Sequence, residues 1–133
     1  MTKSSQVGDL QLAILRVLWA RGEATASDVH AALHAERGLA PTTIATMLKK
    51  MEEGRGLVEH REEGRRFIYR PLVTEEELTR SMVTDLKDRM FGGSVSELVG
   101  HLLSEHELDR GELAELERLI SQAERGRRPK ERR

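Results

Sequence analysis

The 133-residue sequence contains no cysteine. Disulfides, thiolate metal ligands and cysteine nucleophiles are therefore excluded, and a reducing, cytoplasmic location is expected. Aromatic residues make up only 3% of the chain, so the core must be aliphatic, which favours helices. No apolar run approaches the ~20 residues of a membrane-spanning helix. The N-terminal residues also lack the apolar segment of a signal peptide, and we expect no membrane insertion.

The motifs of several common enzyme classes are also missing. The sequence has no Gly-x-Ser-x-Gly, no Walker loop and no Gly-x-Gly-x-x-Gly. His30 and His34 are four residues apart, and His101 and His106 are five apart. Such pairs on a helix are able to hold a metal, but neither has a third ligand nearby in sequence. We therefore predict no enzyme, no metal and no other cofactor, and expect exposed helical histidines.

The net charge of −1 conceals an uneven distribution of charge along the chain. Residues 1–73 hold 11 basic and 9 acidic side chains, whereas residues 74–126 hold 6 basic and 13 acidic ones. Residues 127–133 include five Lys or Arg residues. An excess of two positive charges in the first part is small for a nucleic-acid-binding domain. It suggests DNA binding that needs two copies of the domain.

Local patterns in the first part predict three helices and a hairpin. We expect helices over 9–20, 26–37 and 41–51, each with an apolar stripe at helical spacing. The period then changes, and residues 57–61 and 66–70 are short segments rich in strand-forming residues, separated by a polar turn. Three helices followed by a hairpin is the order of a winged helix-turn-helix domain. The predicted fold class is mainly α with a small β-hairpin wing.

The third helix has two unlike faces. Pro41 suits the first helical position, and Ile44, Leu48 and Met51 form an apolar stripe. The other face carries hydroxyl groups first and ammonium groups last, which is the order that suits base edges and then the DNA backbone. The alternative is an ordinary solvated helix face. The predicted DNA-binding residues of this helix are Thr42, Thr43, Thr46, Lys49 and Lys50.

The hairpin carries two further predicted DNA contacts. Arg65 and Arg66 lie at its tip, where a wing meets phosphates or a minor groove, and a guanidinium suits both. The alternative is an exposed pair balanced by two neighbouring glutamates. We expect Phe67 and Tyr69, which share one side of the second strand, to pack mainly in the core.

The acidic part predicts a helical dimerisation module. Thr74, Ser94 and Asp109 each precede an acid three residues later, a pattern that starts helices. The apolar stripes of these helices are too narrow to be buried within one copy, whereas a second copy would cover them. We therefore predict a winged-helix domain over 1–73, a dimerisation domain over 74–126 and a disordered basic tail over 127–133. The predicted dimerisation residues are Leu78, Met82, Leu86, Met90, Leu98, Leu102, Leu113, Leu116 and Ile120.

Four segments together resemble one protein family. They are Leu18-Trp19, Thr42 to Leu48, Glu63 to Pro71, and Glu97 to Leu103. On these segments the chain is similar to the penicillinase-repressor family over roughly residues 7–124. The third helix combined with the Gly-Arg-x-Phe-x-Tyr wing is the most specific part of this likeness.

The resemblance implies a function and a partner. Members are homodimeric winged-helix transcriptional repressors that place the third helix in the major groove of each half of a palindromic operator. They control antibiotic-resistance or copper-homeostasis genes. In antibiotic-responsive members a membrane sensor with a cytoplasmic metalloprotease triggers cleavage in the dimerisation region. That position falls on His101–Leu102 here, where characterised members have Asn-Phe. Copper-responsive members bind the metal through C-terminal cysteines, which this chain lacks.

Three functional hypotheses remain open from the sequence. The first is a homodimeric repressor that binds palindromic double-stranded DNA and is released by proteolysis. The second is a winged-helix sensor that responds to a ligand or a metal through the histidines or a pocket at the dimer interface. The third is a winged-helix protein–protein adaptor without a DNA role, suggested by the near-neutral charge.

Overall fold

The structure is a computed structural model that describes residues 7–131, apart from the side chains of residue 55 and of residues 128–131. The chain divides into two compact units after Arg89. The sequence placed this boundary after residue 73, between the predicted hairpin and the helix-start signal at Thr74. The difference arises because helix α4 (Glu75–Met90) packs its first turns against the core of the preceding helices.

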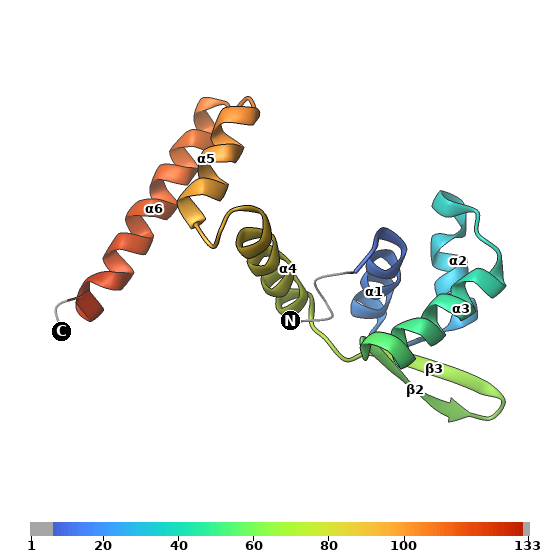
Figure 1. The fold of residues 1–133 in the computed structure, drawn as a ribbon. Helices are drawn as coiled ribbons and strands as arrows, with labels where there is room; N and C mark the ends of the chain where they lie inside the picture. Colours follow the sequence, from blue (N-terminus) through green and yellow to red (C-terminus); the bar gives the residue numbers. More distant parts are fainter. Residues whose placement is uncertain (1–6, 132–133) are drawn as a thin grey trace. The chain divides into compact units, whose positions relative to one another are not determined.

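The three predicted N-terminal helices are present (Figure 1). They are α1 (Asp9–Arg21), α2 (Ala26–Arg37) and α3 (Pro41–Lys50). The capping box that starts α2 is closed in both directions: the Thr25 hydroxyl accepts the Asp28 N–H at 3.1 Å, and the Asp28 carboxylate accepts the Thr25 N–H at 3.0 Å. Helix α2 ends at Gly38, whose φ of 60° is left-handed.

Helix α3 continues directly into a wider turn. Residues Met51–Arg55 form the π-helix η2, which ends at Gly56 with a left-handed φ of 67°. The N–H of Gly56 donates to the carbonyl of Met51, five residues earlier. A π-turn takes up one more residue than an α-turn, so the long link after α3 is wound rather than extended.

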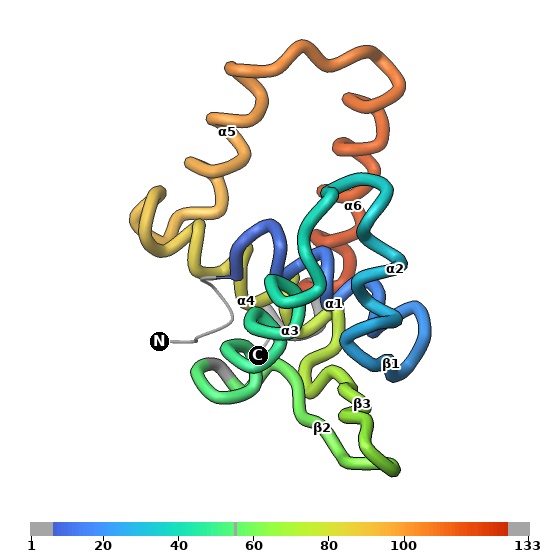
Figure 2. The backbone as a smooth tube through the Cα atoms, turned by 90° about the vertical axis from the view of Figure 1, so that its right-hand side faces the viewer, coloured from blue at the N-terminus to red at the C-terminus, as the bar shows by residue number. Residues whose placement is uncertain are grey.

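A three-stranded antiparallel sheet contains the predicted hairpin, β2 (Val58–Glu63) and β3 (Arg66–Pro71). The strand order is β1-β3-β2, where β1 is the two-residue strand Ala24–Thr25. The sequence did not predict β1, because its pairing with β3 is long-range and two residues carry no alternation. Figure 2 shows the hairpin projecting beyond the helices of the first unit.

The first unit has a closed aliphatic core. Trp19 packs at its edge and donates its indole N–H to the Val73 carbonyl at 2.8 Å, which holds the segment after β3 against α1. Leu78 of α4 is only 2% exposed and belongs to the same core. It is therefore not an exposed dimerisation residue, contrary to the sequence prediction. The fully buried large side chains are Ile14, Leu15, Leu18, Val29, Ile44, Leu48, Met51, Val58 and Leu78.

The second unit consists of α5 (Val95–Glu105) and α6 (Arg110–Glu131). Both helices start at the predicted caps: the Ser94 hydroxyl accepts the Glu97 N–H at 3.0 Å, and the Asp109 carboxylate accepts the Glu112 N–H at 2.8 Å. Helix α6 extends to residue 131, so residues 127–131 are helical and not a disordered tail as predicted. Residues 132–133 lie outside the described residues.

The second unit contains no buried residue within its described part. Its apolar side chains are half-buried at most, and Met90 at its start is 70% exposed. Among the described residues, no helix combines the length and apolarity needed to span a bilayer.

Candidate nucleic-acid interface

The two faces of α3 are separated as the sequence predicted. Ile44 and Leu48 are fully buried and fix the helix on the core of the first unit. The five predicted contact residues are all exposed. The first turn of α3 has no acid, and its last turn carries two lysines. The exposed face, hereafter the recognition face, consists of Thr42, Thr43, Thr46, Lys49 and Lys50.

The recognition face is open to a ligand. A shallow hollow over its surface is lined by the three threonines with Met47 and Lys50. A second hollow lies between the start of α2 and the start of α3 and includes Ser27, His30 and Thr42. Within the described part of the chain, neither lysine of the recognition face forms an ion pair. Both ammonium groups are therefore available to an anion.

The turn that orients α3 is held by a histidine. The Nε2 atom of His30 on α2 lies 2.8 Å from the carbonyl oxygen of Leu39, just before α3 begins. Because a carbonyl only accepts, this nitrogen carries the proton. His30 is thus half-buried rather than exposed as predicted, whereas His34 is exposed. The described residues contain no group of three side chains that would hold a metal ion.

Both predicted wing arginines are exposed at the end of the hairpin. Arg66 is near Glu63, with 3.8 Å between Nη2 and Oε1, whereas Arg65 forms no ion pair within the described part of the chain. Lower in the hairpin, Arg61 binds both carboxylate oxygens of Glu23, at 2.6 and 3.0 Å. This hydrogen bonding lowers the pKa of the Glu23 carboxyl below its usual value. Arg65 is the wing cation best placed to meet a new anion.

The two aromatic residues of β3 behave differently. Tyr69 is 6% exposed and belongs to the core, as expected. Burial raises the pKa of its phenol, and the negative charges of Glu52 and Glu53 raise it further. Phe67 is 44% exposed, contrary to the prediction of core packing, because the hairpin projects past the core at this point. Its ring stacks on His60 with 4.1 Å between centroids.

An exposed helix of threonines and lysines beside a basic hairpin tip is the arrangement of a winged-helix DNA-binding domain. The family model for the penicillinase repressor matches residues 7–122. The chain belongs to the penicillinase repressor family. It is therefore a transcriptional repressor of this family with a DNA-binding domain.

Individual relatives and one solved structure agree with this assignment. The chain is 28% identical to the penicillinase repressor of Bacillus licheniformis, over 92% of this chain and 94% of that one. It is 36% identical to the transcriptional regulator BlaI of Mycobacterium tuberculosis over 86 residues, which are 64% of this chain and 62% of that one. The solution structure of the DNA-binding domain of the repressor BlaI is similar with a TM-score of 0.50 and 31% identity, over 58% of this chain and 93% of that one. These similarities confirm the predicted winged-helix fold.

The predicted dimerisation residues of this family member fall into three groups. Leu78 is in the core and Met82 packs against it. Leu98 and Leu116 are half-buried. The exposed members are Leu86, Met90, Leu102, Leu113 and Ile120.

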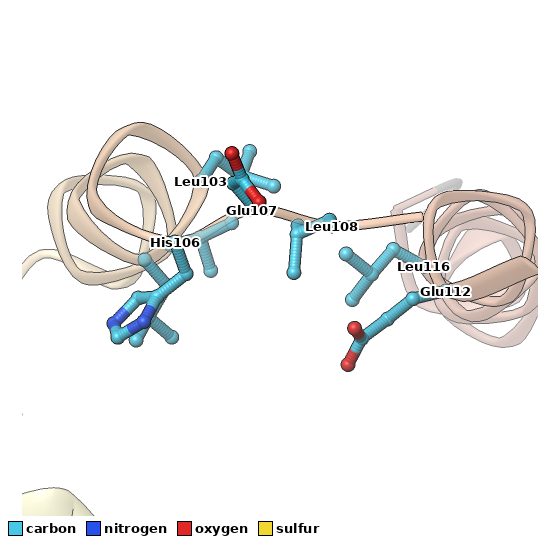
Figure 3. A pocket seen from close by; sticks show the side chains of 8 residues that line it. Leu103, His106, Glu107, Leu108, Glu112 and Leu116 are labelled. Atoms are coloured by element: carbon cyan, nitrogen blue, oxygen red, sulfur yellow. The ribbon is translucent and has the colours of Figure 1, made fainter. Parts of the chain in front are cut away.

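An open apolar hollow lies between α5 and α6, with a volume of about 470 Å³. Figure 3 shows Leu108 on the connection between the two helices, Leu103 and His106 on the α5 side, and Leu116 and Glu112 on the α6 side. Leucine side chains therefore line a hollow that the second unit does not fill itself.

The predicted cleavage position is inside a helix. The His101–Leu102 peptide is in the second half of α5, and both side chains are exposed. The His101 carbonyl accepts a hydrogen bond from the Ser104 hydroxyl at 3.2 Å, and the His101 ring lies 5.6 Å from that of Phe91. Cleavage at this bond would require α5 to unwind locally.

Proposed function

We propose that this repressor binds a palindromic operator as a homodimer. Each copy inserts the recognition face of α3 into the major groove of one half-site, with Thr42, Thr43 and Thr46 directed at base edges. Lys49 and Lys50 bind phosphates beside the groove, and Arg65 and Arg66 bind the backbone or the minor groove at the wing. The observation that carries this proposal is the exposed face of α3. It has hydroxyls at its start, no acid in between, and at its end two lysines that form no ion pair with any described residue.

The size of the interface explains why two copies are needed. One good base contact discriminates by only about 1–3 kcal/mol, and one helix reaches few bases. Joining two half-site contacts in one dimer makes the second contact intramolecular and raises affinity by about 10²–10⁴-fold. The small positive charge of the DNA-binding part agrees with weak binding by a single copy.

The second unit supports the pairing of two copies. Leu102, Leu113 and Ile120 are 42–58% exposed, and the described residues of this unit include no buried one. A second copy that covers the exposed apolar side chains of α5 and α6 would give them the core that they lack. We propose that this surface is the dimer interface. Leu86 and Met90 of α4, which are also exposed, are proposed as further contacts with the second copy.

Loss of the dimer would release the operator. We propose that proteolysis in the second unit, at His101–Leu102 or in the connection after α5, is one such signal, initiated by a membrane sensor with a protease domain. The recognition face would be untouched by this cut.

A selection experiment tests the proposal. Random duplexes and genomic fragments are incubated with the full chain, bound DNA is recovered and sequenced, and the recovered site is then compared with a single half-site in quantitative gel shifts. We expect a palindrome that is bound at least a hundredfold more tightly than its half-site. Recovery of no common sequence, or equal affinity for palindrome and half-site, would contradict the proposal.

The hollow between α5 and α6 also suits the alternative of a ligand-responsive sensor. It is apolar, with His106, Glu107 and Glu112 among its lining residues. Titration of zinc, copper or small apolar compounds during the gel shift separates the alternatives. We expect operator affinity to stay constant, since the second copy is the proposed occupant. A change in affinity that disappears in the His106→Ala variant would favour the sensor.

A further inference from the structure

Three side chains from three elements meet beside the wing. Glu52 in η2 approaches His60 on β2: the His60 Nδ1 atom is 2.7 and 2.9 Å from the two carboxylate oxygens. The backbone N–H of His60 donates to the same carboxylate at 3.2 Å. The other side of the His60 ring contacts Phe67 on β3, with 4.1 Å between centroids and 18° between planes. We call Glu52, His60 and Phe67 the wing clamp.

The wing clamp spans a segment whose glycines give the backbone a wide choice of conformations. Between α3 and β2 the chain passes through Gly54 and Gly56, and Gly56 is left-handed. The π-turn and the buried Leu57 and Val58 hold the end of this link, and the clamp adds a side-chain contact that spans its two glycines. The contact between Glu52 and His60 closes an eight-residue separation across both glycines. The two side chains are only 26% and 27% exposed, so water competes weakly for their hydrogen bonds.

The wing clamp also affects the charge next to the recognition face. Glu52 follows Lys49 and Lys50 within one helical turn, where a free carboxylate would repel DNA phosphates. In the structure both of its oxygens are within hydrogen-bond distance of His60. The carboxylate is thereby occupied by donors of the wing.

We propose that His60 is a positioning residue for DNA binding, which holds the wing at a fixed angle to α3 through Glu52 and Phe67. The inference rests on the proposed DNA contact of Arg65. His60 itself touches no DNA. By orienting the wing, it allows the tip arginines and the recognition face to contact the same duplex. Its effect on affinity is therefore indirect.

A double-mutant cycle on operator binding tests this role. His60→Ala is combined with Arg65→Ala, and operator affinity is measured for the two single variants, the double variant and the unmodified chain at several salt concentrations. We expect His60→Ala to weaken binding on the order of tenfold, similar to the loss of one charge-assisted hydrogen bond. The salt slope should fall by about 1, as for one lost phosphate contact. In the Arg65→Ala background, the same change should have little further effect.

Two further variants separate positioning from simple destabilisation. His60→Asn keeps a donor near the position of Nδ1 and should retain most of the affinity. His34→Ala removes an exposed histidine of α2 and serves as the matched control, with no expected effect. Amide hydrogen exchange gives a readout without DNA: exchange in residues 53–57 should be faster in His60→Ala and unchanged in the control.

The outcomes distinguish the clamp from the proposed function. The positioning role would be overturned if His60→Ala lowered operator affinity by the same factor with and without Arg65, or if amide exchange in residues 53–57 were unchanged. Neither result would contradict the proposed operator binding. If Arg65→Ala has no effect on affinity, the proposed wing contact fails, and so does the path by which His60 acts on DNA. The exchange measurement then decides by itself whether the clamp restrains the link.

Discussion

Helices α3 and α6 carry similar apolar stripes, but only α3 has a partner for its stripe. Ile44 and Leu48 of α3 are fully buried against α1 and α2, whereas Leu113 and Ile120 of α6 are 42% and 58% exposed. The first unit thus closes its own core, and the second unit does not. The comparison shows that an apolar stripe predicts burial without saying in which molecule the burial occurs. In this repressor we propose that a second copy supplies it.

Removal of the second unit gives the largest expected effect. A chain that ends at residue 89 keeps every buried residue of the first unit and should unfold cooperatively. It should nevertheless lose about 10²–10⁴-fold in affinity for the palindrome, because the two half-site contacts become independent. Circular dichroism during heating measures the unfolding, and gel shifts measure the affinity for the palindrome. If the truncated chain binds the palindrome as tightly as the full chain does, the second unit does not join the two half-site contacts.

Substitutions in the apolar stripes of α3 and α6 should affect stability in different ways. Leu48→Ala should lower the free energy of unfolding by about 2–5 kcal/mol, because it leaves a cavity in a closed core. The effect should not depend on protein concentration. Leu113→Ala should instead lower the unfolding midpoint only at protein concentrations at which the unmodified chain is dimeric, since the lost contact is with the proposed second copy. Urea unfolding at two widely separated protein concentrations compares them.

The recognition face should show two classes of residue. Thr46→Ala should reduce discrimination between bases by about 1–3 kcal/mol at one operator position. Lys49→Ala should weaken binding to all sequences and reduce the salt slope by about 1. Competition gel shifts with operator variants at several salt concentrations distinguish these effects. Identical profiles for the two variants would contradict the division between base and phosphate contacts.

The smallest expected effect concerns the helix cap before α2. The Thr25 hydroxyl accepts the Asp28 N–H, and its replacement in Thr25→Ala should cost about 1 kcal/mol of stability. Ser27→Ala is a suitable control, because Ser27 is exposed on the same turn. Thermal unfolding of the truncated chain shows whether the loss is confined to the first unit.

Local patterns predicted most of the fold because they act over short distances. The caps at Thr25, Ser94 and Asp109 and the stop at Gly38 each depend on residues within one turn, and all four are present. The failures involve long-range contacts. Leu78 fits an exposed stripe on its own helix, but it is buried because α4 folds back on the first core. Strand β1 exists only through its pairing with β3.

The candidate site divides in the same way. The faces of α3 follow from helical periodicity, so the exposed threonines and lysines were predictable. The wing clamp was not, because a glutamate after one helix and a histidine on a strand have no recognisable spacing. Phe67 was wrongly assigned to the core. Alternation predicts which side of a strand a residue faces, but it does not predict where the hairpin extends beyond the core.

Sedimentation of the full chain with and without palindromic DNA tests the central claim most directly. We expect dimers at micromolar concentration and two chains on each palindrome, with the dimer lost on truncation after residue 89. A chain that remains monomeric at that concentration and occupies each half-site independently would contradict it.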